Sequence, residues 1–194
     1  MEPSDRYLIQ KAREGDRPAF EELYNRYKKP IFNYICRLLG DRAVAEELTQ
    51  ETFIRVYTNL AQYRPTGKVS SWIYMIAANL AKNELRSREY RKTVSLDSAI
   101  AEDEKLRLGD LLQDTSVGPA DVAENKEVRA QIQKVIHKLP LHHKEVLVLC
   151  DVQGLSYEEA AEILGCSVGT VASRLNRART AFVKIFKEDF GEKV

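Results

Sequence analysis

The sequence predicts an all-α protein in which a flexible acidic linker joins two small helical domains, the C-terminal one containing a helix-turn-helix. Three observations support this fold class. Apolar residues recur at helical spacing through most of both ends of the chain. Acidic residues are concentrated in the middle of the chain, and a glycine-containing turn separates two amphipathic segments near the C-terminus.

The charge distribution sets the predicted domain boundaries. The chain has 194 residues and a formal net charge of +1, but residues 1–92 carry +5, residues 93–125 carry −6 and residues 126–194 carry +2. The middle segment contains Gly118-Pro119 and no sustained helical period, which is typical of a linker. We expect one short helix within it, over 104–112. The three segments are therefore the N-terminal domain, the linker and the C-terminal domain.

The composition indicates a soluble protein of the cytoplasm with no membrane contact of its own. Hydrophobic residues make up 44% and charged residues 30% of the chain. No apolar run approaches the about 18 residues of a membrane span, and the first residues do not resemble a signal peptide. Cys36, Cys150 and Cys166 are odd in number and far apart, so we expect buried thiols, no disulfide framework, no metal and no cofactor.

The N-terminal domain is predicted to contain a long helix that Asp16 caps and Gly40 ends. Its apolar positions continue across Pro30, where we expect a kink. Asp41 then begins a second long helix. The core side of that second helix is formed by Ala45, Leu48, Thr52, Phe53, Val56 and Leu60.

The opposite side of the second helix is polar, with one apolar residue, Ile54, among its members. Its other residues are Glu47, Gln50, Glu51, Arg55 and Thr58. The pattern fits a solvated face with one isolated isoleucine, or an acidic docking face with an apolar anchor. Periodicity alone leaves both interpretations open.

A further helix is expected to begin at Ser70 or Ser71, which would cap it. Its core side carries Ile73, Ile76, Ala77 and Leu80, and its other side carries Trp72, Met75, Asn79, Lys82, Asn83 and Arg86. With Tyr63 and Tyr74, this segment places aromatic rings near amides and cations, the groups with which proteins hold single-stranded nucleic acid. The alternative is that Trp72 packs in the core and the cations only solubilise the helix.

The C-terminal domain is predicted to contain a helix-turn-helix. Ser156 and Glu159 form a capping box, Gly165 ends the first helix and Ser167 caps the second. The inward residues of the second helix are Val168, Val171, Leu175 and Ala178, and the outward ones are Gly169, Thr170, Ser173, Arg174 and Arg177. Short polar residues followed by cations suit a helix that enters the major groove. Dimerisation or protein binding is the alternative role for such a unit.

Four segments in order resemble the signatures of a bacterial extracytoplasmic-function (ECF) sigma factor, the two-domain class of the sigma-70 family. They are GDRPAFEELYNRYKKPIFNYICRLLGD, AEELTQETFIRVY, SSWIYMIAANLAKNELR and LPLHHKEVLVLCDVQGLSYEEAAEILGCSVGTVASRLNRAR. The resemblance implies that the chain binds core RNA polymerase at its clamp coiled coil and flap, directs it to promoters and melts the −10 element. It also implies an anti-sigma partner, and a linker that passes through the polymerase active-site cleft.

The resemblance assigns three groups of residues. By this resemblance, the residues that bind polymerase are Glu47, Gln50, Glu51, Ile54 and Arg55. The residues that bind single-stranded −10 DNA are Tyr63, Lys68, Ser70, Trp72, Asn79, Lys82, Asn83 and Arg86. The residues that bind duplex −35 DNA are Ser167, Thr170, Ser173, Arg174 and Arg177. Many family members carry an aspartate at the position of Asn83 and a lysine at that of Ala172, so promoter specificity is not transferred.

Two other classes of function compete with this one. A response-regulator-like transcription factor that does not join polymerase has a similar C-terminal helix-turn-helix, but it needs a receiver domain of alternating strands and helices. An enzyme needs a catalytic set, and the sequence has neither a glycine-rich phosphate loop nor a recognisable Ser/His/Asp set. The three histidines, His137, His142 and His143, lack metal-ligand partners in the sequence. We therefore predict no enzymatic activity.

Overall fold

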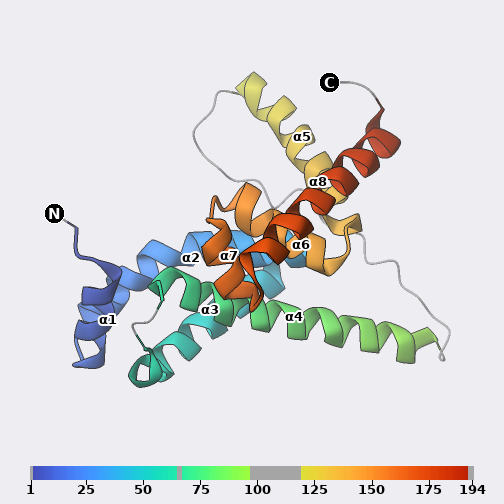
Figure 1. Cartoon of the computed structure of the whole chain (residues 1–194). Helices are drawn as coiled ribbons and strands as arrows, with labels where there is room; N and C mark the ends of the chain where they lie inside the picture. The colour runs from blue at the N-terminus through green and yellow to red at the C-terminus, as the bar shows by residue number, and fades with distance from the viewer. Residues whose placement is uncertain (1, 65–66, 97–118, 192–194) are drawn as a thin grey trace.

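The computed structural model describes residues 2–64, 67–96 and 119–191, and in these residues it contains helices and no strands (Figure 1). The all-α fold class is confirmed. The first half contains α1 (Asp5–Arg13), α2 (Arg17–Leu39), α3 (Arg42–Thr58), the 3-10 turn η1 (Leu60–Gln62) and α4 (Val69–Leu96). The second half contains α5 (Pro119–Lys138), α6 (Leu141–Leu147), the π-helical turn η3 (Val148–Val152), α7 (Tyr157–Leu164) and α8 (Val168–Phe190).

The helices at the domain boundaries are longer than the charge pattern suggested. Helix α4 continues to Leu96 and α5 begins at Pro119, so both extend into the segment 93–125. The short helix expected over 104–112 lies outside the described residues. Helix α2 passes through Pro30 as one continuous element.

The predicted helix ends are mostly confirmed. The Asp16 carboxylate accepts a hydrogen bond from the Ala19 amide at 3.2 Å, and the Asp41 carboxylate accepts one from the Val44 amide at 3.1 Å. Gly40 ends α2 in the left-handed conformation, at φ 71°, which costs glycine no Cβ clash. These local signals depend only on neighbouring residues, which is why the sequence predicts them well.

The predicted start of α4 is wrong. The helix begins at Val69, so Ser70 and Ser71 lie inside its first turn and neither is the cap. Val69 is 3% exposed and Ser71 is 1% exposed, so both face the core. Burial of Val69 favours an earlier start, and this outweighs the preference of serine for the capping position.

Two further burial predictions need correction. Val168 is 40% exposed, because it directly follows the Ser167 cap, and the buried side of α8 begins only at Val171. Cys36 is buried as expected, and burial raises the pKa of its thiol to about 11. Cys150 and Cys166 are only half-buried.

One continuous hydrophobic core extends through both halves of the chain. It contains Tyr34 of α2, Ile73 of α4, Val148 and Leu149 of η3, and Ala160 of α7, each fully buried. Helix α4 packs against α7, and α2 packs against α5 and η3. The two halves are therefore in direct contact in this structure.

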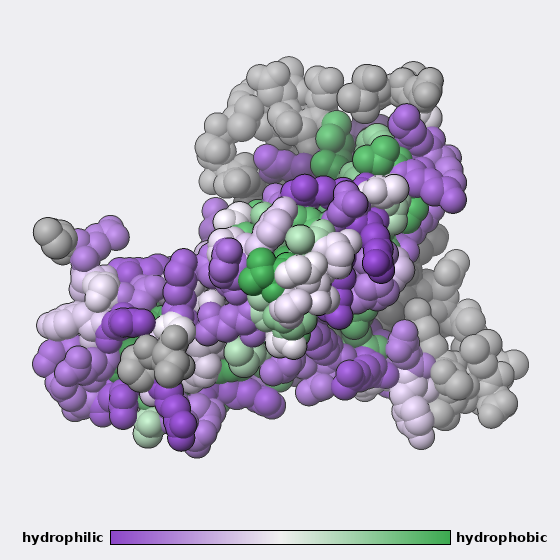
Figure 2. Space-filling model, in the orientation of Figure 1, coloured by the Kyte–Doolittle hydropathy of each residue, from purple (hydrophilic) through white to green (hydrophobic). Residues whose placement is uncertain are grey.

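The surface seen in Figure 2 is mostly hydrophilic over α1 and the neighbouring helices, and apolar residues gather where α8 runs beside α5. Along α8 the rings of Phe182, Phe186 and Phe190 follow one another, with centroids 6.1 and 5.3 Å apart. Val128 and Val183, on these two helices, are 45% and 53% exposed. This part of the molecule therefore leaves apolar surface open to solvent.

Candidate nucleic-acid and polymerase interfaces

The polar side of α3 is exposed as the periodicity predicted. Ile54 is 58% exposed, while Phe53 and Val56 on the opposite side are buried. Arg55 donates to Glu51 one turn earlier at 2.7 Å, so these charges partly neutralise each other. Glu47 and Gln50 are also exposed.

Tyr57 extends this exposed side of α3, and the sequence prediction did not include it. It is 52% exposed and lies three residues after Ile54, on the same side of the helix. Its ring contacts Phe20 of α2, edge to face, at a centroid distance of 5.0 Å. The spacing of Tyr57 from Ile54 is the signal that could have identified it.

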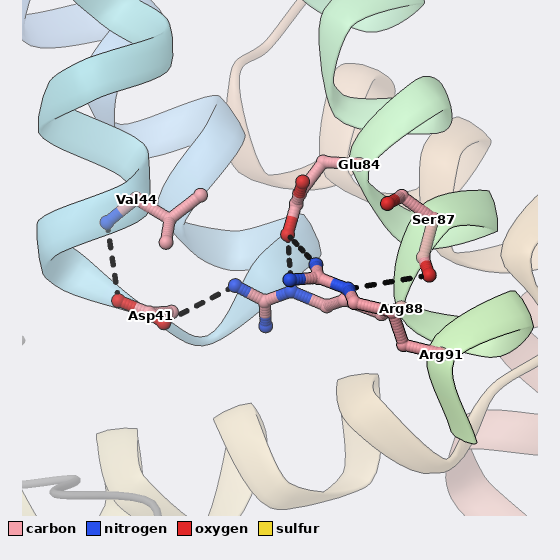
Figure 3. Close-up of polar contacts among 6 residues, drawn as sticks. All are labelled: Asp41, Val44, Glu84, Ser87, Arg88 and Arg91. Carbon is pink, nitrogen blue, oxygen red and sulfur yellow. Dashed lines mark hydrogen bonds and ion pairs between the residues drawn. The ribbon is translucent and has the colours of Figure 1, made fainter. Parts of the chain in front are cut away.

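An ion-pair network joins the beginning of α3 to the second half of α4 (Figure 3). Arg88 donates to Glu84 at 2.8 Å and to Asp41, the residue that caps α3, at 3.1 Å. Arg91 also donates to Glu84, at 3.1 Å. This network connects α4 to the start of α3, and it engages both cations within the protein.

The outer side of α4 presents amides and cations at helical spacing. Asn79, Asn83 and Arg86 are exposed, as predicted. Lys82, on the same helix, is different: its side chain is 24% exposed and its ammonium lies 3.2 Å from a carboxylate oxygen of Glu145 in α6. Burial raises the pKa of Glu145, and the nearby Lys82 opposes that shift.

The aromatic residues just before α4 and in its first turns are too buried to offer free ring faces for stacking on bases. Tyr63 is 7% exposed, its ring lies 4.9 Å from that of Trp72, and its hydroxyl donates to the Gly67 carbonyl at 3.2 Å. Trp72 and Ser70 are half-buried. Lys68 is exposed, but its ammonium lies 3.1 Å from the Glu159 carboxylate in α7. Tyr74 is 3% exposed and belongs to the core.

The first turns of α8 form the exposed end of the helix-turn-helix. The Ser167 hydroxyl accepts from the Thr170 amide at 3.1 Å, and the capping box of α7 is complete, with both of its hydrogen bonds present. Ser173 and Arg177 are exposed, and Arg174 is half-buried. The helix therefore presents short polar residues first and cations one to two turns later, which suits entry into the major groove.

Arg179, farther along α8, is also exposed, but it is paired within the protein. Its guanidinium makes two hydrogen bonds to the Asp151 carboxylate, at 2.9 and 2.6 Å. This paired geometry holds α8 against η3. The charge of Arg179 is therefore engaged within the protein.

The described residues contain no cluster of histidine, cysteine and carboxylate side chains that could hold a metal ion. His137 is half-buried beside Gln133, with Nε2 of each side chain 2.6 Å apart. Burial, with the nearby Lys144 and Arg88, lowers the pKa of His137 to about 4. The histidine is therefore neutral near pH 7 and has a structural environment.

Two family models match the chain, one in each half. Sigma-70 region 2 matches residues 23–91, and sigma-70 region 4 matches residues 129–182. The first model contains α3 and most of α4, and the second contains the helix-turn-helix. These matches define the chain as a two-region sigma-70 protein.

Similar proteins of known class indicate which kind of sigma-70 protein this chain is. The chain is 35% identical to RNA polymerase sigma-H factor of Pseudomonas aeruginosa over 180 residues, 93% of this chain and 92% of the relative. It is 34% identical to ECF RNA polymerase sigma factor SigW of Bacillus subtilis over 188 residues, 97% of this chain and all of the relative. It is also 34% identical to ECF RNA polymerase sigma-E factor of Escherichia coli, with 92% of each chain covered.

Solved structures share the fold. CnrH in complex with the cytosolic domain of CnrY has a TM-score of 0.68 at 23% identity, covering 96% of this chain and 99% of that one. The sigma factor RpoE in complex with the anti-sigma factor NepR, from Bartonella quintana, has a TM-score of 0.67 at 23% identity, covering 88% and 98%.

The chain belongs to the ECF sigma factors of the sigma-70 family, and it is an alternative sigma factor. The response-regulator interpretation is not favoured, because region 2 occupies the part of the chain where a receiver domain would have to lie. Among the described residues, no helix is both long enough and apolar enough to cross a membrane.

Proposed function

We propose that three separate surfaces divide the work of this sigma factor. The exposed side of α3 binds the clamp coiled coil of core RNA polymerase, the outer side of α4 holds the single-stranded −10 element, and the start of α8 binds the duplex −35 element. The observation that carries the proposal is the presence of regions 2 and 4 in one helical chain, each with an exposed polar face. On this proposal the protein works in the cytoplasm, where polymerase and DNA are.

The polymerase surface is supported by its apolar centre within a charged rim. Ile54 and Tyr57 are both more than half exposed and lie on the same side of α3, so together they form an apolar centre that a partner could cover. Glu47, Gln50 and Arg55 surround them on the same helix. Apolar surface along α8 and α5 is the candidate contact for the polymerase flap.

The −10 surface is supported by the amides and cations on α4. The side-chain amides of Asn79 and Asn83 offer donors and acceptors to base edges, and Arg86 offers charge to a phosphate. A base must leave the stack before this surface can bind its edges. Binding the unstacked base then keeps the melted strand from pairing again. Trp72 is half-buried and its ring contacts that of Tyr63, so only part of it is available to a base.

An anti-sigma factor is the proposed regulator. The support is that both structural neighbours with the same fold were solved in complexes, and the partner of RpoE in one of these complexes is the anti-sigma factor NepR. Nothing in the described residues indicates a catalytic role, and we propose that the chemistry of transcription belongs entirely to the polymerase.

Transcript mapping with the reconstituted holoenzyme tests the proposal. Purified chain is mixed with core RNA polymerase and genomic DNA, and the 5′ ends of the RNA are sequenced. We expect a limited set of start sites that share −35 and −10 sequences absent from reactions with core polymerase alone. Start sites without a common upstream sequence would contradict the proposed division of surfaces.

A further inference from the structure

The residues assigned to the −10 surface include no fully exposed aromatic ring. Proteins that hold unpaired strands combine cations with aromatic side chains on which bases stack. Tyr63 and Tyr74 are 7% and 3% exposed, and Trp72 is half-buried with its ring 4.9 Å from that of Tyr63. If this surface has a free ring, that ring lies farther along α4.

Tyr90, toward the end of α4, continues the row of exposed side chains on the outer side of the helix. It is 73% exposed, more than any other large hydrophobic residue in the part of the chain that the structure describes. It follows Arg86 by four positions, Asn83 by seven and Asn79 by eleven. At about 100° per residue, these four positions lie within about 60° of one another around the helix. Tyr90 therefore adds an open ring to a row of two amides and one cation.

The neighbouring ion pairs leave this side of α4 open. Arg88 and Arg91 both donate to Glu84, at 2.8 and 3.1 Å (Figure 3). By the same angular spacing, these three residues lie on the side of α4 opposite Tyr90. Among the residues that the structure describes, the Tyr90 ring contacts no other ring and no cation. The ring is thus available for a partner.

The row has a length that suits a short single strand. At about 1.5 Å per residue, Tyr90 lies about 10 Å from Asn83 and about 16 Å from Asn79 along the helix axis. Stacked nucleotides of one strand are about 3.4 Å apart, so about five nucleotide steps span the row, and fewer when the strand is extended. Arg86 lies about one turn before Tyr90, where its guanidinium can bind a phosphate next to the base that meets the ring.

The two ends of the row should act on the strand in different ways. The side-chain amides of Asn79 and Asn83 can distinguish bases, because the edges of the bases differ in their donors and acceptors. A tyrosine ring accepts any base, because every base has a π-face. Tyr90 should therefore contribute affinity without base preference.

We propose that Tyr90 is the stacking platform of the −10 surface, where its ring covers one unpaired base while Arg86 binds an adjacent phosphate. The inference rests on the proposed function of α4 and adds to it a residue that strengthens binding of the melted strand. The occupant is single-stranded DNA, because the amides and the cation in line with Tyr90 match base edges and phosphate. A protein contact of the same ring is one outcome of the test.

The affinity of the reconstituted holoenzyme for a fluorescent single strand, carrying the −10 element of a mapped promoter, tests the proposal. Tyr90→Ala removes the ring, and loss of one stacked base should weaken binding by about 5- to 150-fold. Tyr90→Phe keeps a ring and should restore most of the affinity. Tyr7→Ala is the matched control, because Tyr7 is 53% exposed on α1, and it should bind the strand as wild type does.

Two further measurements identify the loss as stacking. An abasic nucleotide, placed at each position of the strand in turn, should weaken wild-type binding at the position that faces the ring and cost Tyr90→Ala much less there. The slope of log affinity against log salt should be unchanged in Tyr90→Ala. In Arg86→Ala, which loses one phosphate contact, that slope should fall by about 0.7.

Three results would overturn the stacking role. The first is equal strand affinity of Tyr90→Ala and Tyr7→Ala, and the second is a loss in Tyr90→Ala that couples to no abasic position. The third is weaker binding of Tyr90→Ala to core polymerase without DNA, which would assign the ring to a protein contact. Tyr90→Gln, a good helix former without a ring, must show the same loss as Tyr90→Ala and unfold at the same denaturant concentration as wild type.

The strand assay also separates failure of the stacking role from failure of the proposed function. If the wild-type holoenzyme binds the −10 strand no better than a scrambled strand, the proposed function of α4 fails. If it prefers the −10 strand and Tyr90→Ala binds as wild type does, the function stands and the stacking role is rejected.

Discussion

Replacing Ile54 by aspartate is expected to weaken binding to core RNA polymerase while leaving the fold intact. Ile54 is 58% exposed, and fully burying an isoleucine is worth about 1.5 to 3 kcal/mol, so covering the exposed part contributes roughly 1 to 2 kcal/mol. Because 1.4 kcal/mol is a factor of ten, Ile54→Ala alone should cost about 5- to 30-fold in affinity. Ile54→Asp should cost more, since an unpaired carboxylate would be buried.

The assay is fluorescence anisotropy of labelled sigma factor titrated with core polymerase, with Tyr7→Asp as the matched control. Tyr7 is 53% exposed on α1 and lies outside the proposed surface. Surface substitutions of this kind usually change stability by less than about 0.5 kcal/mol, so both variants should unfold at similar denaturant concentrations. Equal core affinity for Ile54→Asp and Tyr7→Asp would refute the assignment of the α3 side to polymerase binding.

Two more predictions concern charged groups. Arg177→Ala should weaken −35 duplex binding by about 1 to 3 kcal/mol if Arg177 contacts a base. Arg179→Ala should leave DNA affinity nearly unchanged, because the Asp151 carboxylate already holds the Arg179 guanidinium. Gel-shift titrations on matched and scrambled duplexes distinguish a base contact from a phosphate contact. Because burial lowers the pKa of His137 from 6.5 to about 4, the unfolded chain binds a proton first, so stability should fall as the pH drops from 6.5 towards 4. Chemical denaturation across this range should show a shallower fall for His137→Gln, and identical pH profiles would exclude His137 as the cause.

Helix ends and helix faces were largely predictable from the sequence. Asp16, Asp41, Ser156 and Ser167 cap helices through bonds to amides three residues away, so the signal is contained in a few adjacent letters. The exposed Ile54 and the buried Phe53 follow from a period of 3.6 residues. Ser70 broke the pattern because burial of Val69, a tertiary effect, moved the start of the helix.

The partners of the cations that we propose to contact DNA could not be predicted in the same way. Lys68 and Lys82 contact Glu159 and Glu145, which lie 91 and 63 positions away in the chain. The sequence contains no signal for a pairing at that separation, because it depends on how one domain is placed on the other. The same holds for Arg179, which the fold pairs with Asp151, 28 positions earlier in the chain.

Local patterns in the sequence were enough to establish the helical class, the helix-turn-helix, the sigma-70 resemblance and the division of charge. The set of charged and aromatic groups that remain available depended instead on the tertiary structure. The fold buried Tyr63 and Tyr74, left Tyr57 exposed, and placed acidic side chains of the C-terminal domain beside Lys68, just before α4, and Lys82 within it. This difference arises because burial and long-range ion pairing are properties of packed surfaces, and a packed surface brings together residues that the chain keeps far apart.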